Sequence, residues 1–314
     1  MSRPAAAIEV HHLSKNFDGN EVLAPFDLSV PHGSIFALLG HNGAGKTTLI
    51  KLLLNILAPG SGSATVLGQP ITSLAGPAFT RIGYISENQE LPEWMTVQGL
   101  LDYLRPFYPL WDETGLLEDL DLPPDRKLGQ LSRGMRMKAM FASVLAFKPS
   151  LILMDEPFAG LDVVTRDMLI RTLMGRLDSK DEHSGRSETT ILISSHELAE
   201  IETFATHVAF LHEGRLLSAE PMANLIMRFR EVTVRLSSPE PVATCRRFPA
   251  DWLSPELSGA ILRFTYTGAN MEDPETIVRR EIPGAEHVDS DPMNLQTIFL
   301  ALAKANRTRH GSLR

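Results

Sequence analysis

Three patterns of apolar and polar positions divide the first two thirds of this 314-residue chain. In the first pattern, Asp, Pro and Gly interrupt short apolar runs, which predicts antiparallel strands. These runs fall at residues 7–13, 17–22 and 26–40. In the second pattern, helical spacing of apolar residues predicts a helical subdomain over about 89–147. Its helix-like runs are residues 97–108, 114–122 and 135–147.

The third pattern consists of two continuous apolar runs, residues 150–157 and 189–196, which end abruptly in polar residues. Such runs are typical of central strands in a parallel sheet that is covered on both faces and carries a site at its carboxyl ends. Between them, residues 164–177 have helical spacing and residues 178–188 are polar. This arrangement predicts a helix followed by a loop, within an α/β domain.

A second domain is predicted after a boundary near residue 228. Two β-like and two helix-like runs follow this point, at residues 231–238, 260–268, 274–281 and 293–305. Elements of these lengths are enough for a small α+β unit. We therefore expect a large α/β domain at 1–228, a small α+β domain at 229–306 and a flexible tail at 307–314.

Composition narrows the class of protein. Apolar residues make up 43% of the chain and charged residues 22%, as in ordinary globular domains. The net charge of −8 argues against a broad nucleic-acid-binding face. Cys245 is the only cysteine, so no disulfide can form within the chain, which suits a reducing cytoplasm. No run of about 18 apolar residues lacks charge or proline, so we expect no membrane span.

The stretch GHNGAGKTT, residues 40–48, lies between a strand-like and a helix-like run and fits the pattern G-x-x-x-x-G-K-S/T. Its glycines allow backbone N–H groups to point inward and form an anion nest at the start of a helix. Lys46 can then reach the β- and γ-phosphates, and the Thr47 hydroxyl can bind Mg²⁺. The alternative is a glycine-rich turn with an exposed lysine, but the strand-to-helix context favours nucleotide binding.

Two further motifs point to the same chemistry. Asp155 and Glu156 end one buried run, where they could hold the Mg²⁺ shell and polarise an attacking water. LSRGM, residues 131–135, begins a helix with Ser132 and can offer a hydroxyl and free N–H groups to a phosphate. Each has a structural alternative, since such carboxylates can be solvated caps and Ser132 can be an ordinary helix N-cap.

Three smaller features gain meaning only from their order along the chain. Asp162 ends the turn GLD, His196 closes the run at 189–196, and Phe17 lies in LSKNFDG. Taken alone, Asp162 marks a turn, His196 is a polar residue beyond a strand, and Phe17 is a core residue. With all these motifs in this order, residues 8 to about 220 resemble the nucleotide-binding subunits of ABC transporters.

The resemblance implies a P-loop NTPase core that binds ATP, with an antiparallel β-subdomain and a helical arm. It also implies that ATP is held between two copies of the subunit. The signature motif of one copy would close on the γ-phosphate held by the other, through Ser132, Gly134 and Met135.

The same resemblance implies a role for each matching position. Phe17 would stack on the adenine, and Asp155 would assist the metal. Glu156 would be the catalytic carboxylate, His196 would contact the γ-phosphate, and Asp162 would communicate across the dimer. Phosphates and Mg²⁺ would be held by Gly40, His41, Asn42, Gly43, Ala44, Gly45, Lys46, Thr47 and Thr48.

Two departures from the family pattern affect these roles. LSRGM stands where LSGGQ is more usual, so Arg133 and Met135 replace glycine and glutamine. Backbone contacts should survive this change, whereas the side-chain contact of the glutamine would be lost. Glu87 aligns with the glutamine of the Q-loop, and Gln89 lies two residues further on. A carboxylate suits Mg²⁺ or its water, and either Glu87 or Gln89 could sense the metal.

The motif sequences look most like single-cassette subunits that pair with a separate transmembrane permease for export. In the family, residues 91–95 would face that permease, while the alternative is that Trp94 packs inside the helical arm. We therefore expect a dimeric ATPase that uses ATP and Mg²⁺ and binds no nucleic acid. It would lie peripherally on the cytoplasmic face of the inner (plasma) membrane.

Two other functions remain open on the sequence. A soluble ABC ATPase acting on nucleic acid or the ribosome would usually contain two cassettes, long coiled coils or basic inserts. A nucleotide-dependent regulator could use the small C-terminal domain to bind another protein. The sequence leaves open the transported substrate, the direction of transport beyond resemblance, and pairing with a similar cassette instead of a second copy.

Overall fold

The computed structural model describes residues 6–178, 189–237, 248–268 and 272–311. Its contacts divide the chain into two compact units. Unit 1 comprises Met1–Glu197 and Leu211–Leu216, and unit 2 comprises Leu198–Phe210 and Leu217–Arg314. Residues 179–188 of the predicted loop and Cys245 lie outside the described residues. The predicted domain boundary near residue 228 stays a prediction.

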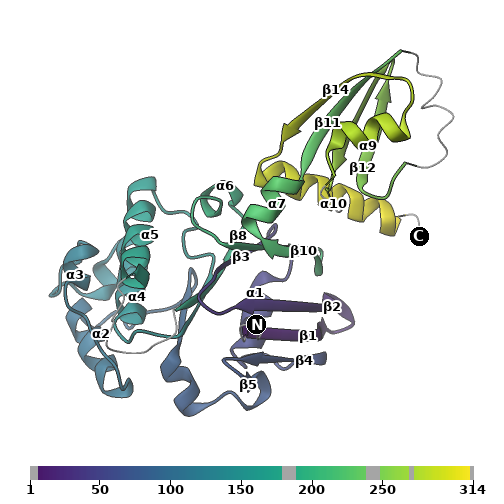
Figure 1. The fold of residues 1–314 in the computed structure, drawn as a ribbon. Coiled ribbons are helices and arrows are strands. Elements are labelled where there is room, and N and C mark those ends of the chain that lie inside the picture. Colours follow the sequence, from purple (N-terminus) through teal and green to yellow (C-terminus); the bar gives the residue numbers. More distant parts are fainter. Residues whose placement is uncertain (1–5, 179–188, 238–247, 269–271, 312–314) are drawn as a thin grey trace, which may run out of the picture. The chain divides into compact units, whose positions relative to one another are not determined.

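Unit 1 begins with a four-stranded sheet of order β2-β1-β4-β5 (Figure 1). Its strands are β1 (Ala6–Phe17), β2 (Asn20–Pro31), β4 (Ser61–Val66) and β5 (Gln69–Pro70). Strands β1 and β2 pair antiparallel around Asp18 and Gly19, whose φ angles of 48° and 88° suit a tight turn. The antiparallel strands predicted from the first pattern are confirmed as far as residue 31, whereas residues 35–39 form β3, which pairs parallel with its neighbour in the second sheet.

A six-stranded sheet of order β10-β9-β3-β8-β7-β6 carries the elements of the predicted site. Its strands are β3 (Ile35–Leu39), β6 (Ile82–Ser86), β7 (Leu151–Asp155), β8 (Thr190–Ser195), β9 (His207–His212) and β10 (Arg215–Pro221). Neighbours β3 and β8, β8 and β7, and β7 and β6 are parallel. Every residue of β7 and β8 is buried, as continuous apolar runs predict for covered parallel strands. The carboxyl ends of these four strands therefore meet at one edge.

Helices follow the strand ends and form the arm of unit 1. α1 (Lys46–Leu53) follows β3, and α5 (Val163–Asp178) follows β7. The predicted helical arm contains α2 (Val97–Leu104), α3 (Leu116–Asp119) and α4 (Arg133–Leu145). Short 3₁₀ turns lie at η1 (Ile71–Ser73), η2 (Gly76–Arg81), η3 (Arg105–Phe107) and η4 (Leu128–Gln130). Thr96 and Ser132 cap the N-termini of α2 and α4 with their hydroxyl oxygens.

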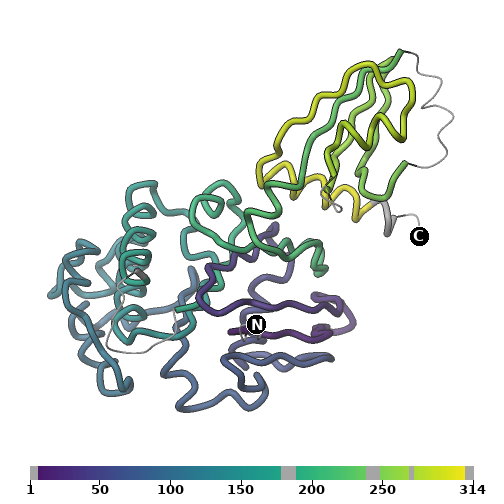
Figure 2. The backbone as a smooth tube through the Cα atoms, viewed as in Figure 1, coloured from purple at the N-terminus to yellow at the C-terminus, as the bar shows by residue number. Residues whose placement is uncertain are grey.

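Unit 2 contains an antiparallel sheet of order β12-β13-β11-β14, whose backbone Figure 2 follows in green and yellow. Its strands are β11 (Arg230–Leu236), β12 (Trp252–Ser258), β13 (Ile261–Tyr266) and β14 (Ala285–Pro292). Its helices are α6 (Leu198–Ile201), α7 (Met222–Arg228), α9 (Pro274–Glu281) and α10 (Leu295–Gly311). Apolar residues of α9 pack on one sheet face, where Trp252 and Phe264 stack with ring centroids 4.0 Å apart. The predicted α+β class of this part is confirmed.

Three features of unit 2 differ from the sequence prediction. β12 contains Pro255, and β14 is largely exposed and polar, so neither shows the apolar alternation by which strands are found. α10 extends to Gly311 and so includes the first residues of the tail predicted from residue 307, whose flexibility stays a prediction. Ala, Leu and Lys favour helix, and basic residues stabilise its C-terminal end. No helix among the described residues is long and apolar enough to cross a bilayer.

Candidate active site

The loop at residues 40–48 joins β3 to α1 through a backbone that requires glycine at three positions. Gly43 and Gly45 have φ angles of 83° and 106°, which side chains other than glycine rarely adopt. A Cβ atom on Gly40 would lie 2.2 Å from the carbonyl oxygen of Leu211. The chain thus curls tightly before the start of α1, as a backbone cradle for an anion requires.

Lys46 is the first residue of α1, and its side chain folds back over this loop. It is only 5% exposed, and its Nζ donates to the carbonyl oxygens of Gly40 at 2.6 Å and His41 at 3.1 Å. The same ammonium lies 3.0 Å from Glu156 Oε1. The alternative of an exposed lysine on a glycine-rich turn is therefore wrong.

The remaining loop residues line the entrance to this curl. His41 and Asn42 are exposed, and His41 Nδ1 lies 2.7 Å from the Asn42 carbonyl oxygen. Ala44 is buried and its N–H donates to the His41 carbonyl oxygen at 3.1 Å. Thr48 is partly buried in the first turn of α1. The exposed residues leave the open side of the loop accessible from solvent.

Asp155 lies at the end of β7, where hydroxyl groups from two other elements converge on it. It is 4% exposed, and its Oδ1 accepts hydrogen bonds from Thr47 Oγ1 at 3.1 Å and Ser194 Oγ at 2.7 Å. A solvated strand cap would be exposed, so that alternative is wrong for Asp155. Ser194 was not predicted as a site residue, although it is one of two serines that interrupt the apolar run before His196.

Glu156 sits between a lysine and a histidine. Its φ angle of 53° is unusual for a residue with a side chain, and its N–H donates to Ser194 Oγ at 3.0 Å. Glu156 Oε2 lies 2.8 Å from His196 Nδ1. Oε1 is near Lys46 Nζ in distance, yet this buried oxygen has no partner with hydrogen-bond geometry. We regard the lysine contact as charge attraction, which leaves one acceptor of the carboxylate unused.

This cluster fits a magnesium ion that binds together with phosphates. The cluster contains the Lys46 ammonium and the carboxylates of Asp155 and Glu156. A bound phosphate chain would add further negative charge, so a second cation would be needed to balance it. Thr47 and Asp155 offer a hydroxyl and a carboxylate oxygen, the hard donors that Mg²⁺ prefers. When bound there, Mg²⁺ would neutralise charge on the phosphate oxygens.

Glu87 follows β6 at the same sheet edge, but its carboxylate has a different partner. The Glu87 N–H donates to the Asp155 carbonyl oxygen at 3.2 Å, whereas its carboxylate forms an ion pair with Arg133. Gln89 donates its N–H to the Ser86 carbonyl oxygen at 3.1 Å. The metal role of Glu87 stays a prediction, and sequence spacing did not indicate its pairing with Arg133.

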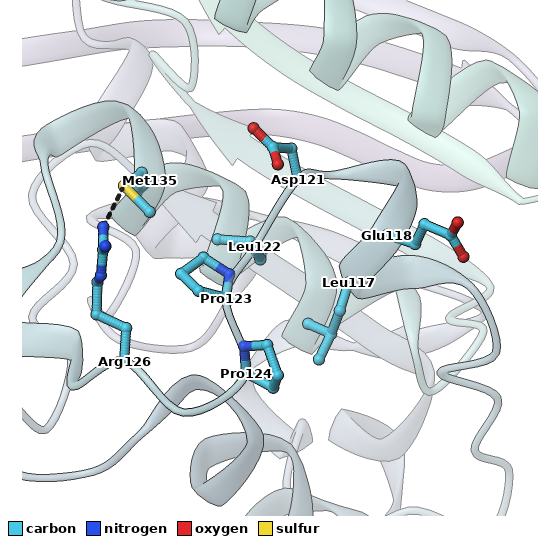
Figure 3. Close-up of a pocket in the computed structure, with 8 residues that line it drawn as sticks. All are labelled: Leu117, Glu118, Asp121, Leu122, Pro123, Pro124, Arg126 and Met135. Carbon is cyan, nitrogen blue, oxygen red and sulfur yellow. Dashed lines mark hydrogen bonds between the residues drawn. The ribbon is translucent and has the colours of Figure 1, made fainter.

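The predicted signature residues contact the helical arm and α5. Ser132 Oγ caps α4 by accepting from the Met135 N–H at 3.3 Å. A Cβ atom on Gly134 would lie 3.3 Å from Thr165 Cγ2. Met135 Sδ lies 3.9 Å from Arg126 Nη1, and both side chains line a cavity of about 570 Å³ (Figure 3). Ser132 does act as an N-cap, and this does not prevent it from binding a phosphate.

Asp162 caps α5 from an exposed position. Its carboxylate accepts from the Thr165 N–H at 2.9 Å and from the Thr165 hydroxyl at 2.8 Å. These two bonds, the backbone one first, hold the pKa of Asp162 below its ordinary value. Asp162 is therefore charged at neutral pH and fixed in direction at the start of α5.

Phe17 and Trp94, for which the sequence allowed both a functional role and packing in the core, are exposed. Phe17 ends β1, is 39% exposed, and has Lys15 Nζ 4.8 Å from its ring centroid. Its interpretation as a core residue is wrong, while stacking on adenine stays a prediction. Trp94 is 72% exposed. The alternative that Trp94 packs inside the helical arm is therefore wrong.

The known proteins that are similar to this chain are ATP-binding proteins of transport systems. The sequence profile of the family described as "ABC transporter" matches residues 23–159. The ABC transporter ATP-binding protein YtrB of Bacillus subtilis (strain 168) is 33% identical over 222 residues, which cover 69% of this chain and 73% of YtrB. The Nod factor export ATP-binding protein I of Burkholderia orbicola (strain AU 1054) is 30% identical over 311 residues, covering 95% and 97%.

A solved structure described as the ATP-binding subunit of an ABC transporter has the same fold. It is 27% identical and covers 70% of this chain and 91% of that chain, with a TM-score of 0.61.

Proposed function

Because this chain belongs to the ATP-binding subunits of ABC transporters, we propose that it couples ATP-driven closure of a dimer to export through a separate membrane-spanning subunit. ATP binding and ATPase activity in transport follow from family membership. The proposal of export is supported mainly by similarity to an export protein. Similarity to the Nod factor export ATP-binding protein I extends over 95% of this chain and therefore includes residues of both units.

The geometry around Lys46 supports the phosphate-binding step. A phosphate chain seated in the 40–48 loop would accept hydrogen bonds from the loop N–H groups and attract the Lys46 ammonium. Lys46 now lies 3.0 Å from Glu156 Oε1, so this attraction would weaken its hold on the carboxylate. The freed Glu156 would then orient a water for attack, while His196 Nδ1, 2.8 Å from Oε2, fixes the carboxylate in direction.

A second copy of the chain would complete the site. Ser132, Gly134 and Met135 contact the helical arm and α5 within their own chain. The Ser132 hydroxyl and the backbone N–H groups at the start of α4 would cap the phosphates held by the partner copy, and such positioning supplies most of the rate enhancement in phosphoryl transfer. We therefore expect slow hydrolysis by a monomer.

Exposed aromatic side chains on the helical arm support docking to a permease. Trp94, Tyr103 and Phe107 are 72%, 56% and 60% exposed, and the Tyr103 and Phe107 ring centroids lie 5.6 Å apart. Exposed aromatics of this size are enriched at protein interfaces. Bound in this way, the chain would be a peripheral protein on the cytoplasmic face of the inner (plasma) membrane.

The Glu156→Gln variant tests the dimer and its catalytic carboxylate together. We expect it to bind ATP but to lose at least about a hundredfold of turnover. It should also run as a dimer in size-exclusion chromatography with ATP and Mg²⁺. Glu286→Gln, an exposed carboxylate of β14, serves as the control and should behave as wild type. Wild-type turnover in Glu156→Gln would remove Glu156 from this role.

Crosslinking from residue 94 tests the membrane partner. We expect a photoreactive residue at this position to crosslink to an integral membrane protein when the assembly is purified gently in detergent. A photoreactive residue in place of Glu286 is the control and should give no such product. Crosslinks only to ribosomal proteins, or only to soluble proteins, would contradict transport and favour the soluble alternatives.

A further inference from the structure

We propose that Glu87 and Arg133 act as paired positioning residues, which hold the 159–161 segment after the catalytic carboxylate, and that Glu87 does not bind the metal. The Arg133 guanidinium forms an ion pair with Glu87 and donates from Nη2 to the Ala159 carbonyl oxygen at 2.7 Å. One side chain therefore joins the end of β6, the start of α4 and the segment after β7. This proposal rests on the role proposed above for Glu156.

Gly160 provides the space in which this pairing occurs. Its φ angle is 65°, and a Cβ atom there would lie 3.0 Å from the Arg133 guanidinium carbon. The guanidinium therefore packs directly against the backbone at Gly160. Ser132 begins α4 immediately before Arg133, so the cap fixes where the arginine side chain starts.

The charges of the two residues are matched within this chain. The Glu87 backbone lies beside Asp155, whose carbonyl oxygen accepts its N–H at 3.2 Å. An unpaired carboxylate at position 87 would add negative charge near the phosphates, and Arg133 neutralises it.

A second arginine holds the same segment from its other end. Arg166 Nη2 donates to the Leu161 carbonyl oxygen at 3.5 Å and lies 3.6 Å from Glu197 Oε2. Glu197 follows His196 directly in the chain. Residues 159–161 are thus held between two arginine–glutamate pairs, one anchored after β6 and the other after β8.

The 159–161 segment is also connected to the catalytic carboxylate. The Ala159 N–H donates to the Glu156 carbonyl oxygen at 3.2 Å, and Leu161 is followed by Asp162. Movement of the Ala159 carbonyl would therefore be transmitted to the left-handed backbone of Glu156 and to Asp162. Because Arg133 is 54% exposed and Glu87 31%, the pair should be sensitive to salt.

A double-mutant cycle of ATPase activity tests the proposal with Glu87→Gln, Arg133→Gly and the combined variant. We expect each single change to lower kcat about three- to tenfold, with the KM for ATP changed less than about twofold. The combined variant should recover most of the loss, because both charges leave together. The Mg²⁺ concentration for half-maximal activity should stay at the wild-type value in all three.

The charge-reversed variant Glu87→Arg with Arg133→Glu provides a second measurement if a single variant folds poorly. It should restore kcat to within about threefold of wild type, because the ion pair is rebuilt with opposite polarity. The control is Asp167→Asn with Arg171→Ala, which removes an exposed pair 2.8 Å apart within α5 and should leave kcat unchanged. Thermal unfolding midpoints of all variants identify any general loss of structure.

Two outcomes would overturn the proposal. Effects of the single changes that simply multiply in the double variant would show that the residues act independently. A raised Mg²⁺ requirement in Glu87→Gln, with glycine or arginine at position 133, would identify Glu87 as a metal ligand. Wild-type turnover in Glu156→Gln would instead contradict the catalytic role of Glu156, and the coupling between Glu87 and Arg133 could still be measured in the same assay.

Discussion

Units 1 and 2 differ in where they place polar side chains. Every buried polar or charged side chain among the described residues belongs to unit 1, including Lys46, Lys138, Asp155 and Ser194. Unit 2 has a core of apolar and aromatic residues such as Trp252 and Phe264. Its Arg228–Glu220 pair, with side chains 21% and 17% exposed, is only partly buried.

The difference indicates what each unit is built to do. A buried charge costs several kcal/mol unless partners compensate it, so a cluster of such charges points to a ligand that completes it. In unit 1 we propose that this ligand is ATP, bound together with Mg²⁺. Unit 2 has a core without such groups in the part that the structure describes, so its contribution to function is to be sought on its surface.

The Lys46→Ala variant should give the largest effect, because it removes the cation at the centre of the buried cluster. We expect ATPase activity to fall by at least about a thousandfold. Magnesium-dependent ATP binding should be lost in isothermal titration calorimetry. Lys51→Ala, in the last turn of the same helix, is the control and should bind ATP normally. Unchanged ATP affinity in Lys46→Ala would contradict the proposal that the buried charged cluster of unit 1 binds ATP.

Trp252→Ala should affect stability and leave the chemistry in place. Trp252 is 4% exposed and stacks on Phe264, so truncation should destabilise unit 2 by about 3–5 kcal/mol. Thermal unfolding should show a lower transition, while ATPase activity of the folded protein below that transition stays within about twofold of wild type. A loss of turnover comparable with that of Lys46→Ala would contradict the view that unit 1 contains the ATPase site while the core of unit 2 contributes only stability.

Alanine substitution at two glycines with positive φ compares the cost of backbone strain alone with the cost of strain plus a steric clash. A Cβ atom on Gly45 would lie 2.6 Å from Leu23 Cδ2, whereas one on Gly259 would meet no atom within 4 Å. Gly45→Ala should therefore destabilise unit 1 by about 2–3 kcal/mol and weaken ATP binding. Gly259→Ala in unit 2 should lose about 1 kcal/mol, with ATP binding unchanged. Equal losses in chemical denaturation would contradict the predicted crowding of the 40–48 loop.

The smallest effect concerns a surface ion pair of the helical arm. Lys148 Nζ lies 2.9 Å from Asp112 Oδ2, and its hydrogen bond lowers the pKa of Asp112 to about 2. Since the folded pKa lies below the unfolded value, the pair stabilises above about pH 4, and this contribution disappears as the pH falls toward 2. Solvent screening limits it to about 1 kcal/mol or less.

Denaturation of Asp112→Asn alongside wild type measures this contribution. The variant should be the less stable at pH 6, and the difference should shrink between pH 4 and pH 2. A difference that persists at pH 2 would contradict the lowered pKa. A large effect of Lys46→Ala and a small effect of Asp112→Asn would together show that the functional charged residues differ from other charged residues in their burial.

The sequence predicted most elements of unit 1, because its strands and helices follow strong local patterns. The runs at 150–157 and 189–196 are continuous apolar segments, and they form the parallel strands β7 and β8. In unit 2 the prediction missed β12 and β14, whose residues lack apolar alternation. Their strand conformation depends on pairing with β13 and β11, which are distant in sequence.

The amino-acid sequence by itself determined the 40–48 loop, because glycine spacing, Lys46 and the flanking runs all lie within a few consecutive residues. It also determined the family, through the order of the motifs. The tertiary structure alone decided which charged groups meet. The Glu87 carboxylate is directed to Arg133, 46 residues away in the chain, and the Ser194 hydroxyl to Asp155, 39 residues away. Such contacts depend on how strands and helices pack, and local spacing contains no information about that packing.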